Sequence, residues 1–179
     1  MGRLFDAVAA LVGVRDTVNY EGQAAIELEQ AADESAAAPD GAAPNPRESV
    51  QIGGRMSRSG PPNGYPARTS GGLLYGSDLI RGVVADLRAG VEVPLIAARF
   101  HAGLSDLLTR AAVDACATTG LDTVALSGGV FQNVLLLRLL TADLDAAGLR
   151  VLTHSRVPPN DAGVSLGQVA VAAARDASG

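Results

Sequence analysis

The sequence lacks the features of disulfide-stabilised, membrane and nucleic-acid-binding proteins. Cys116 is the only cysteine among 179 residues, which excludes an internal disulfide and a cysteine-rich zinc site. No apolar run reaches the roughly 18 residues that a membrane-spanning helix needs, and no signal peptide is recognisable, so we expect a cytoplasmic protein. Aromatic residues make up 3% and the net charge is −5, which argues against base stacking and against electrostatic binding of nucleic acid.

The rest of the composition indicates one folded unit with a single interruption. Hydrophobic residues make up 47% and charged residues 18%, which excludes a disordered chain. The length is typical of one domain or of one lobe of a larger domain. Residues 31–72 are rich in Ala, Pro, Ser and Gly and have no lasting period. We therefore expect a long, flexible, low-complexity insertion there, poorly ordered over about 34–70, with a hint of a strand at Val50 and Ile52.

Apolar residues at helical spacing predict several helices in the first two thirds of the chain. Ser77 or Asp78 is expected to cap the helix that carries Leu79. The expected helices lie at Leu4–Val12, around Ala25–Leu28, at Leu79–Leu87 and at about Pro94–Thr118, with glycine stops at Gly13, Gly90 and Gly120.

The last third alternates between short apolar runs and helical patterns. Thr123–Leu126 suits a buried parallel strand, Val130–Ala146 a helix, Arg150–Thr153 a second strand and Val164 to about Arg175 a closing helix. This order is typical of an α/β fold, with the strands near Val124 and Val151 adjacent and parallel. Ligands of such folds bind at the carboxyl ends of the strands, where the loops 127–133 and 158–163 are expected.

Ser127-Gly128-Gly129 follows the first predicted strand and precedes a helix. Paired glycines let a ligand approach the backbone, and the N–H groups of a helix start favour a phosphate. Asn133 follows one turn later, placed to hydrogen-bond a nucleotide. An ordinary strand–helix turn explains the glycines equally well, and neither G-x-x-x-x-G-K-[ST] nor a full G-x-G-x-x-G is present.

A degraded nucleophile elbow is a further interpretation of the same turn. Asp145 and His154 follow Ser127 in the order of a hydrolase triad. However, Ala125 replaces the first glycine of the elbow, and one short helix-to-strand segment carries both partners. We therefore give this interpretation less weight.

Asp161 precedes a helix in a proline-rich loop, where it suits an N-cap or a metal ligand, and the spacing favours the cap. For the other polar candidates we favour structural roles: solvated helix charges, structural histidines and an inert core thiol. These residues are Asp6, Glu21, Glu27, His101, His154 and Cys116.

Five longer stretches carry the most specific signal. They are Gly2–Ala9, Tyr20–Glu27, Ala97–His101, Ala125–Asn133 and Val157–Gln168. In this order they resemble the C-terminal end of the hydrogenase-maturation carbamoyltransferases, the HypF family, over nearly everything except the insertion. The last domain of that family is related to the enzymes that threonylcarbamoylate tRNA. Its fold is actin/Hsp70-like (ribonuclease-H-like), and two lobes close on a nucleotide. The resemblance implies that residues 1–179 are the second lobe.

The resemblance also implies which residues bind ligands. Acidic side chains would hold the ribose of an adenylate, glycines would let the backbone approach it, an amide would bond to it, and a carboxylate would bind a divalent metal. The implied residues are Asp6 and Glu27 for the ribose, Gly22, Gly128 and Gly129 for the backbone, Asn133 for the amide and Asp161 for the metal.

The implied reaction has two stages. ATP and carbamoyl phosphate give carbamoyl-adenylate, and the C-terminal domain passes the carbamoyl group to the C-terminal cysteine of a HypE-type partner. The group becomes the cyanide ligand of nickel–iron hydrogenase. The partner's thiolate would be the nucleophile, so Cys116 need not react.

One departure from the family sets a limit on this expectation. The metal-binding histidines of the family lie in the first lobe, upstream of this chain's start, as do its acylphosphatase-like, zinc-finger and YrdC-like domains. We therefore expect a truncated form, or one that needs the missing upstream domains from another polypeptide. The alternative is a non-catalytic remnant that binds a nucleotide or serves for docking.

Overall fold

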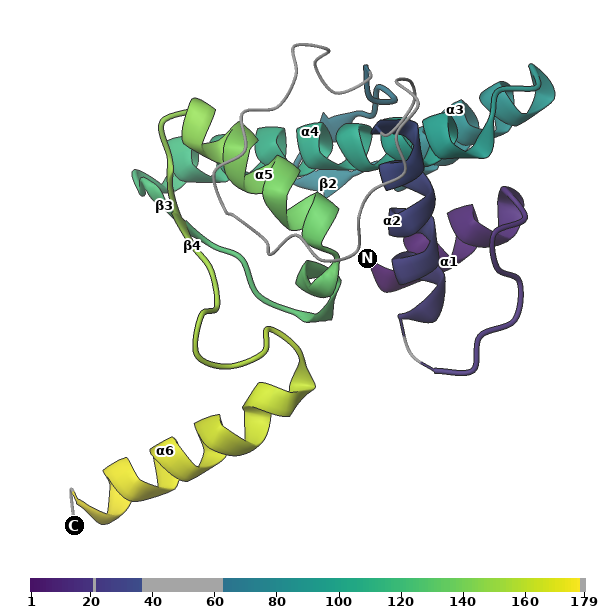
Figure 1. Ribbon diagram of the computed structural model, residues 1–179. Helices are drawn as coiled ribbons and strands as arrows, with labels where there is room; N and C mark the ends of the chain where they lie inside the picture. The colour runs from purple at the N-terminus through teal and green to yellow at the C-terminus, as the bar shows by residue number, and fades with distance from the viewer. Residues whose placement is uncertain (21, 37–62, 178–179) are drawn as a thin grey trace.

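The structure, a computed structural model, describes residues 1–20, 22–36 and 63–177 as a helical layer followed by a small parallel sheet (Figure 1). None of the described helices is both long enough and apolar enough to span a lipid bilayer. The elements are α1 (Gly2–Leu11), α2 (Gln23–Ala36), β1 (Thr69–Ser70), β2 (Leu73–Leu74), α3 (Gly76–Arg88), α4 (Val93–Thr119), β3 (Thr123–Ala125), the 3-10 helix η1 (Gly129–Gln132), α5 (Val134–Ala146), β4 (Arg150–Leu152), the 3-10 helix η2 (Asp161–Gly163) and α6 (Val164–Asp176).

The long helix α4 is the centre of the helical layer. Helices α2, α3 and α5 all pack against it, and α1 packs on α2. The rings of Phe5 and Phe100 meet edge to face with their centroids 5.2 Å apart, an arrangement that the ring quadrupoles favour. The largest fully buried side chains include Phe5, Leu28, Leu79, Ile96, Phe100, Leu104 and Leu136.

A segment that begins at residue 63 lies against α4 because glycine permits a very close approach. A Cβ atom at Gly103 would lie only 2.5 Å from the carbonyl oxygen of Tyr65. The backbone N–H of Tyr65 donates to the carbonyl of Arg99 at 3.3 Å, and its hydroxyl donates to Asp86 Oδ2 at 2.7 Å. Main chain and side chain together fix this segment between α3 and α4.

The predicted extent of the flexible insertion, residues 31–72, is therefore wrong at both ends. Helix α2 continues to Ala36, and Tyr65 and Ala67 are buried in the core. Strands β1 and β2 pair antiparallel, with Thr69 opposite Leu74. The composition does not predict this ordered structure. The structure depends on how single residues fit against α4 and not on a repeating spacing of apolar residues. Residues 37–62, including the expected strand at Val50 and Ile52, lie outside the described part of the chain.

The C-terminal half forms a β–α–β unit. Strands β3 and β4 are parallel, with Val124 opposite Val151, which confirms the predicted pairing. Helix α5 connects them and packs against α4 and β4. Strand β3 is half-buried rather than buried, because the described part of this sheet has only two strands.

Helix α3 begins differently from the prediction. Its N-cap is Tyr75, which makes no side-chain cap bond, so neither Ser77 nor Asp78 caps the helix. Asp78 instead accepts a hydrogen bond at 2.7 Å from Nε of Arg68 and also pairs with Arg81. Arg68 lies in the preceding segment, and this tertiary partner replaces the local cap.

Candidate functional site

The loops that follow β3 and β4 lie side by side at the carboxyl ends of these strands. The N–H of Gly128 donates to the carbonyl of Pro159 at 2.8 Å. The hydroxyl of Ser127 lies 2.9 Å from Nε2 of His154. Because β3 and β4 are parallel, the two loops meet at one edge, where the sequence analysis expects a ligand.

Gly128 and Gly129, in the loop after β3, differ in whether the backbone conformation requires glycine. Gly128 has φ +105°, a conformation that other residues rarely adopt. Gly129 is not in that region, and a Cβ atom there would meet only Gln132 Nε2 at 3.7 Å and Asn160 Cβ at 3.8 Å. The backbone conformation thus requires glycine at 128, whereas nothing in the described fold requires it at 129.

The expected helix over Val130–Ala146 is divided at Asn133. Residues Gly129–Gln132 form η1, and Asn133 has extended dihedral angles. Its side-chain Oδ1 accepts a hydrogen bond from the N–H of Leu136 at 2.7 Å, so Asn133 is the N-cap of α5. Asn133 is only 5% exposed. Its amide therefore has a structural role in addition to any contact with a ligand.

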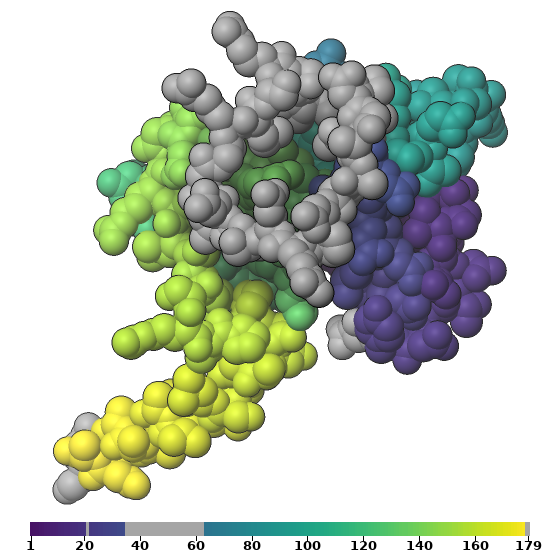
Figure 2. Space-filling view, viewed as in Figure 1, coloured from purple at the N-terminus to yellow at the C-terminus, as the bar shows by residue number. Residues whose placement is uncertain are grey.

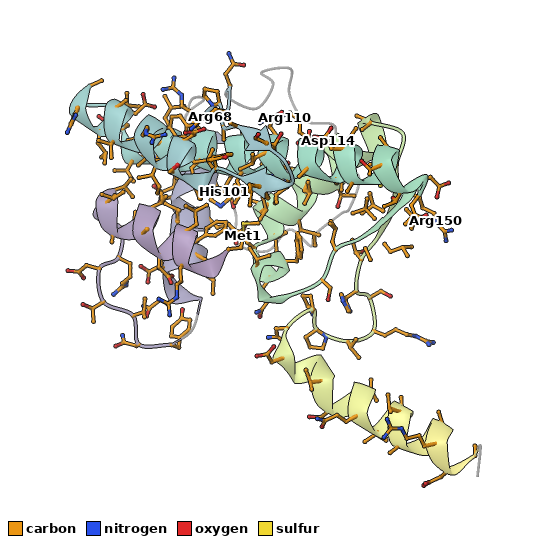
Figure 3. All side chains as sticks on the ribbon, turned by 180° about the vertical axis from the view of Figure 1, so that it is seen from behind. Met1, Arg68, His101, Arg110, Asp114 and Arg150 are labelled. Carbon is orange, nitrogen blue, oxygen red and sulfur yellow. The ribbon has the colours of Figure 1, made fainter. Side chains whose placement is uncertain are left out.

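The second partner of Asn133 is His101, a fully buried side chain of α4. Nδ1 of His101 lies 2.8 Å from the carbonyl oxygen of Ala97, which can only accept, so Nδ1 carries the proton. Nε2 therefore accepts from the Asn133 amide nitrogen at 3.1 Å. Burial lowers the pKa of His101 and favours this neutral form. Figure 3 shows His101 on the side of α4 that faces the N-terminal helices, and Phe5 lies edge-on to its ring. The expected structural role of His101 is confirmed.

Glu29 also belongs to this region, although no motif in the sequence indicates it. Its Oε1 accepts a hydrogen bond from the N–H of Leu135 at 2.7 Å, so a carboxylate of α2 helps to cap α5. Burial raises the pKa of Glu29, and the backbone bonds at the start of α5 partly oppose that shift. No local signal could reveal this pair, because the two residues are 106 positions apart.

The three expected ribose-side residues lie on or just before the N-terminal helices. Asp6 is exposed on α1, and Gly22 precedes α2 with φ +83°. Glu27 forms a two-point ion pair with Arg15, with Nε–Oε2 at 2.7 Å and Nη2–Oε1 at 2.5 Å. Arg15, followed by the side chain of Gln23, lowers the pKa of Glu27. A ligand hydroxyl at Glu27 would have to share the carboxylate with Arg15. Glu21 lies outside the described residues.

Asp161 is exposed as the first residue of η2. The cap of this short helix is Asn160, whose Oδ1 accepts from the N–H of Ala162 at 3.2 Å, so the expectation that Asp161 is the cap is wrong. Within the ranges that the structure describes, no three His, Cys, Asp or Glu side chains gather as metal ligands. Asp161 can thus contribute one carboxylate oxygen ligand, and the described residues alone do not complete a metal site.

The structure brings together two of the three residues of the hydrolase interpretation. Ser127 and His154 are hydrogen-bonded, whereas Asp145 lies in the last turn of α5. Helix α5 runs from the carboxyl end of β3 back to the start of β4, so its last turn lies at the opposite edge of the sheet. The triad is therefore wrong. His154 is exposed, and Cys116 is half-buried rather than a core residue.

Sequence comparisons connect the whole chain to one group of enzymes. The family described as "Carbamoyltransferase, Kae1-like Domain, second subdomain" matches residues 1–168. Carbamoyltransferase HypF2 of Cupriavidus necator is 39% identical over 98% of this chain and 22% of the relative. Carbamoyltransferase HypF of Synechocystis is 31% identical over 94% of this chain and 19% of the relative.

Solved structures agree with this result. Full-length HypF in a phosphate- and nucleotide-bound form is 35% identical, with a TM-score of 0.74 over 96% of this chain and 20% of that one. HypF of T. kodakarensis is 25% identical, with a TM-score of 0.72 over 94% of this chain and 19% of that one. The expected α/β lobe of the actin/Hsp70-like type is confirmed.

The chain spans about a fifth of the length of these relatives and solved structures. The chain belongs to the HypF carbamoyltransferase family, in which it matches the second subdomain of the Kae1-like domain.

Proposed function

We propose that this chain forms one wall of the adenylate site of a carbamoyltransferase. The enzyme passes a carbamoyl group from carbamoyl-adenylate, made from ATP and carbamoyl phosphate, to the C-terminal cysteine of a HypE-type partner during nickel–iron hydrogenase maturation. In this step the thiol sulfur bonds to the carbamoyl carbon, the bond from that carbon to the phosphate oxygen breaks, AMP leaves and the thiol proton passes to solvent. The chain acts together with the upstream domains of the family.

The observation that carries this proposal is the free space at Gly129. The fold needs glycine at 128 for the backbone, but at 129 a methyl group would make only ordinary contacts. A glycine that the fold itself does not require is explained by a ligand that lies against the backbone. This glycine also lies in the loop at the carboxyl end of β3, where ligands of α/β folds bind.

The other proposed nucleotide residues differ in how freely they can respond to a ligand. Asp6 is exposed, Glu27 is shared with Arg15, and Asn133 is held by Leu136 and His101. Asn133→Ala would therefore weaken binding partly through the fold. Gly129 gives the cleaner test, because it can be enlarged without removing a hydrogen bond or straining the backbone.

The metal implied by the family cannot be placed on the described residues alone. Asp161 supplies one exposed carboxylate, and no further ligands gather around it within the described ranges. A site that includes Asp161 requires donors from the other subdomain or from substrate phosphates. We assign no reaction step to the metal.

The test measures binding and turnover separately. We expect the isolated chain to bind AMP weakly, as measured by calorimetry, and Gly129→Leu to reduce that binding at least about tenfold by filling the space above the loop. The matched control is Gly76→Leu, because Gly76 borders a separate apolar hollow beside Leu4. Equal AMP affinity of the Gly129→Leu variant and the wild type would contradict the proposed site.

Turnover discriminates between the carbamoyltransferase and a non-catalytic remnant. We expect no carbamoyl transfer by the isolated chain, because an open half-site lacks its remaining ligands and does not exclude water from a hydrolysable adenylate. Transfer should appear when the upstream domains are restored, and Asp161→Ala should then abolish it. If the restored enzyme binds AMP but transfers no carbamoyl group, the remnant is the better description.

A further inference from the structure

Ser127 and His154 form a hydrogen-bonded pair beside the proposed adenylate site. Nε2 of His154 lies 2.9 Å from the hydroxyl oxygen of Ser127, and both side chains are exposed. Ser127 lies two residues beyond the end of β3, and His154 lies two residues beyond the end of β4. Because these strands are parallel, the pair lies at the carboxyl edge of the sheet, next to the glycine turn.

The loop that carries His154 is both attached to the glycine turn and open to solvent. The carbonyl of Pro159, in the same loop, accepts a hydrogen bond from the N–H of Gly128 at 2.8 Å. Figures 1 and 2 show the segment between β4 and α6 at the surface, outside the helical layer. The C-terminal cysteine of a partner protein can therefore reach this edge from solvent.

The proposed transfer needs a group that removes a proton at this edge. A cysteine thiol ordinarily has a pKa of about 8.5, so only a small fraction of it is the nucleophilic thiolate at pH 7. Imidazole is the side chain most often used as a general base near neutral pH. A histidine beside the adenylate would raise the fraction of acceptor that can attack the carbamoyl carbon.

The other candidate bases of the site have different roles. Both ring nitrogens of His101 have partners, and this side chain is fully buried. Glu27 is paired with Arg15, which lowers the pKa of Glu27 and makes it a poorer base. Asp161 is the proposed metal ligand. His154 has an exposed ring nitrogen whose partner is a hydroxyl, which an incoming thiol can replace.

We infer that His154 is the general base for carbamoyl transfer to the thiol of the HypE-type partner. The thiol takes the place of the Ser127 hydroxyl and gives its proton to Nε2 of His154. The sulfur bonds to the carbamoyl carbon, the bond from that carbon to the phosphate oxygen breaks, AMP leaves and the imidazolium releases the proton to solvent. The inference rests on the proposed function, because it requires an adenylate at the glycine turn.

The acidity of the acceptor tests this role. Transfer is measured in the enzyme with its upstream domains restored, to a HypE-type C-terminal peptide that ends in cysteine and to the same peptide ending in selenocysteine, whose selenol is ionised at pH 7. We expect His154→Ala to lower kcat/KM at least about 100-fold with the cysteine peptide and less than about threefold with the selenocysteine peptide. Free imidazole should restore part of the transfer to cysteine. Arg156→Gln is the matched control and should change neither rate, because Arg156 is exposed on the same loop.

Equal losses with the two peptides would overturn the inference, because a residue that binds the adenylate or only shapes the loop affects both acceptors alike. Unchanged transfer to cysteine by His154→Ala would overturn it as well. If the restored enzyme transfers to neither peptide, NMR of the isolated chain with AMP provides the test. AMP should shift the ring signals of His154, and unmoved signals at saturating AMP would contradict the inference. Absence of AMP binding would instead refute the proposed adenylate site, and the inference with it.

Discussion

Replacing His101 with leucine should change both the stability of the lobe and its dependence on pH. The substitution introduces an apolar side chain of similar size and removes the acceptor for the Asn133 amide, which is buried. A buried donor left without a partner costs about 1–3 kcal/mol. At pH 7.5 we therefore expect His101→Leu to unfold more easily than the wild type by about that amount.

The pH dependence separates this cost from ordinary packing effects. The pKa of His101 is lowered by burial in the folded chain, so between the folded and the unfolded pKa the unfolded chain binds more protons. Wild-type stability is thus complete above the unfolded pKa of about 6.5 and falls as the pH is lowered, by up to about 1.4 kcal/mol per pH unit. The His101→Leu variant cannot lose this contribution. The two stabilities should therefore converge as the pH is lowered below about 6.5, so that the difference of about 1–3 kcal/mol becomes smaller.

Urea denaturation between pH 5 and 8 measures this difference. The shifted pKa values of carboxylates such as Glu29 and Glu27 affect both proteins alike and cancel when the two curves are subtracted. His154→Leu is the matched control, because His154 is exposed and makes its contact with Ser127 at the surface. Parallel wild-type and His101→Leu curves over the whole range would refute the assignment of a neutral, buried His101.

Three further changes test other parts of the structure. Gly103→Ala should destabilise the lobe by at least about 1–3 kcal/mol in urea denaturation, because its Cβ would clash with the Tyr65 carbonyl at 2.5 Å, and an unchanged midpoint would contradict the packing. Tyr65→Phe should raise the pKa of Asp86 in an NMR titration, since the Tyr65 hydroxyl is the largest cause of its lowered value. Arg15→Gln should likewise raise the pKa of Glu27, and an unshifted titration would show that the ion pair is absent in solution.

Local patterns were sufficient for the long helix α4 and for the parallel pairing of β3 and β4. The spacing of apolar residues places α4 within one residue of its observed ends, and Gly120 ends it in the left-handed conformation. The parallel pairing of Val124 and Val151 follows from two short apolar runs joined by a helix. The position of the glycine loop at the carboxyl end of β3 follows from the same reasoning. These features depend on neighbours in the sequence, which is why the sequence reveals them.

Tertiary structure decided what the individual polar side chains do. Asn133, expected one turn inside a helix, is its N-cap because His101 of α4 holds its amide. Asp78 binds Arg68 rather than capping α3, and Glu29 reaches the start of α5 from 106 positions away. A carboxylate or amide accepts equally well from any donor that the fold brings near. Its partner is therefore set by how the helices pack, and the spacing of residues along the chain carries no record of it.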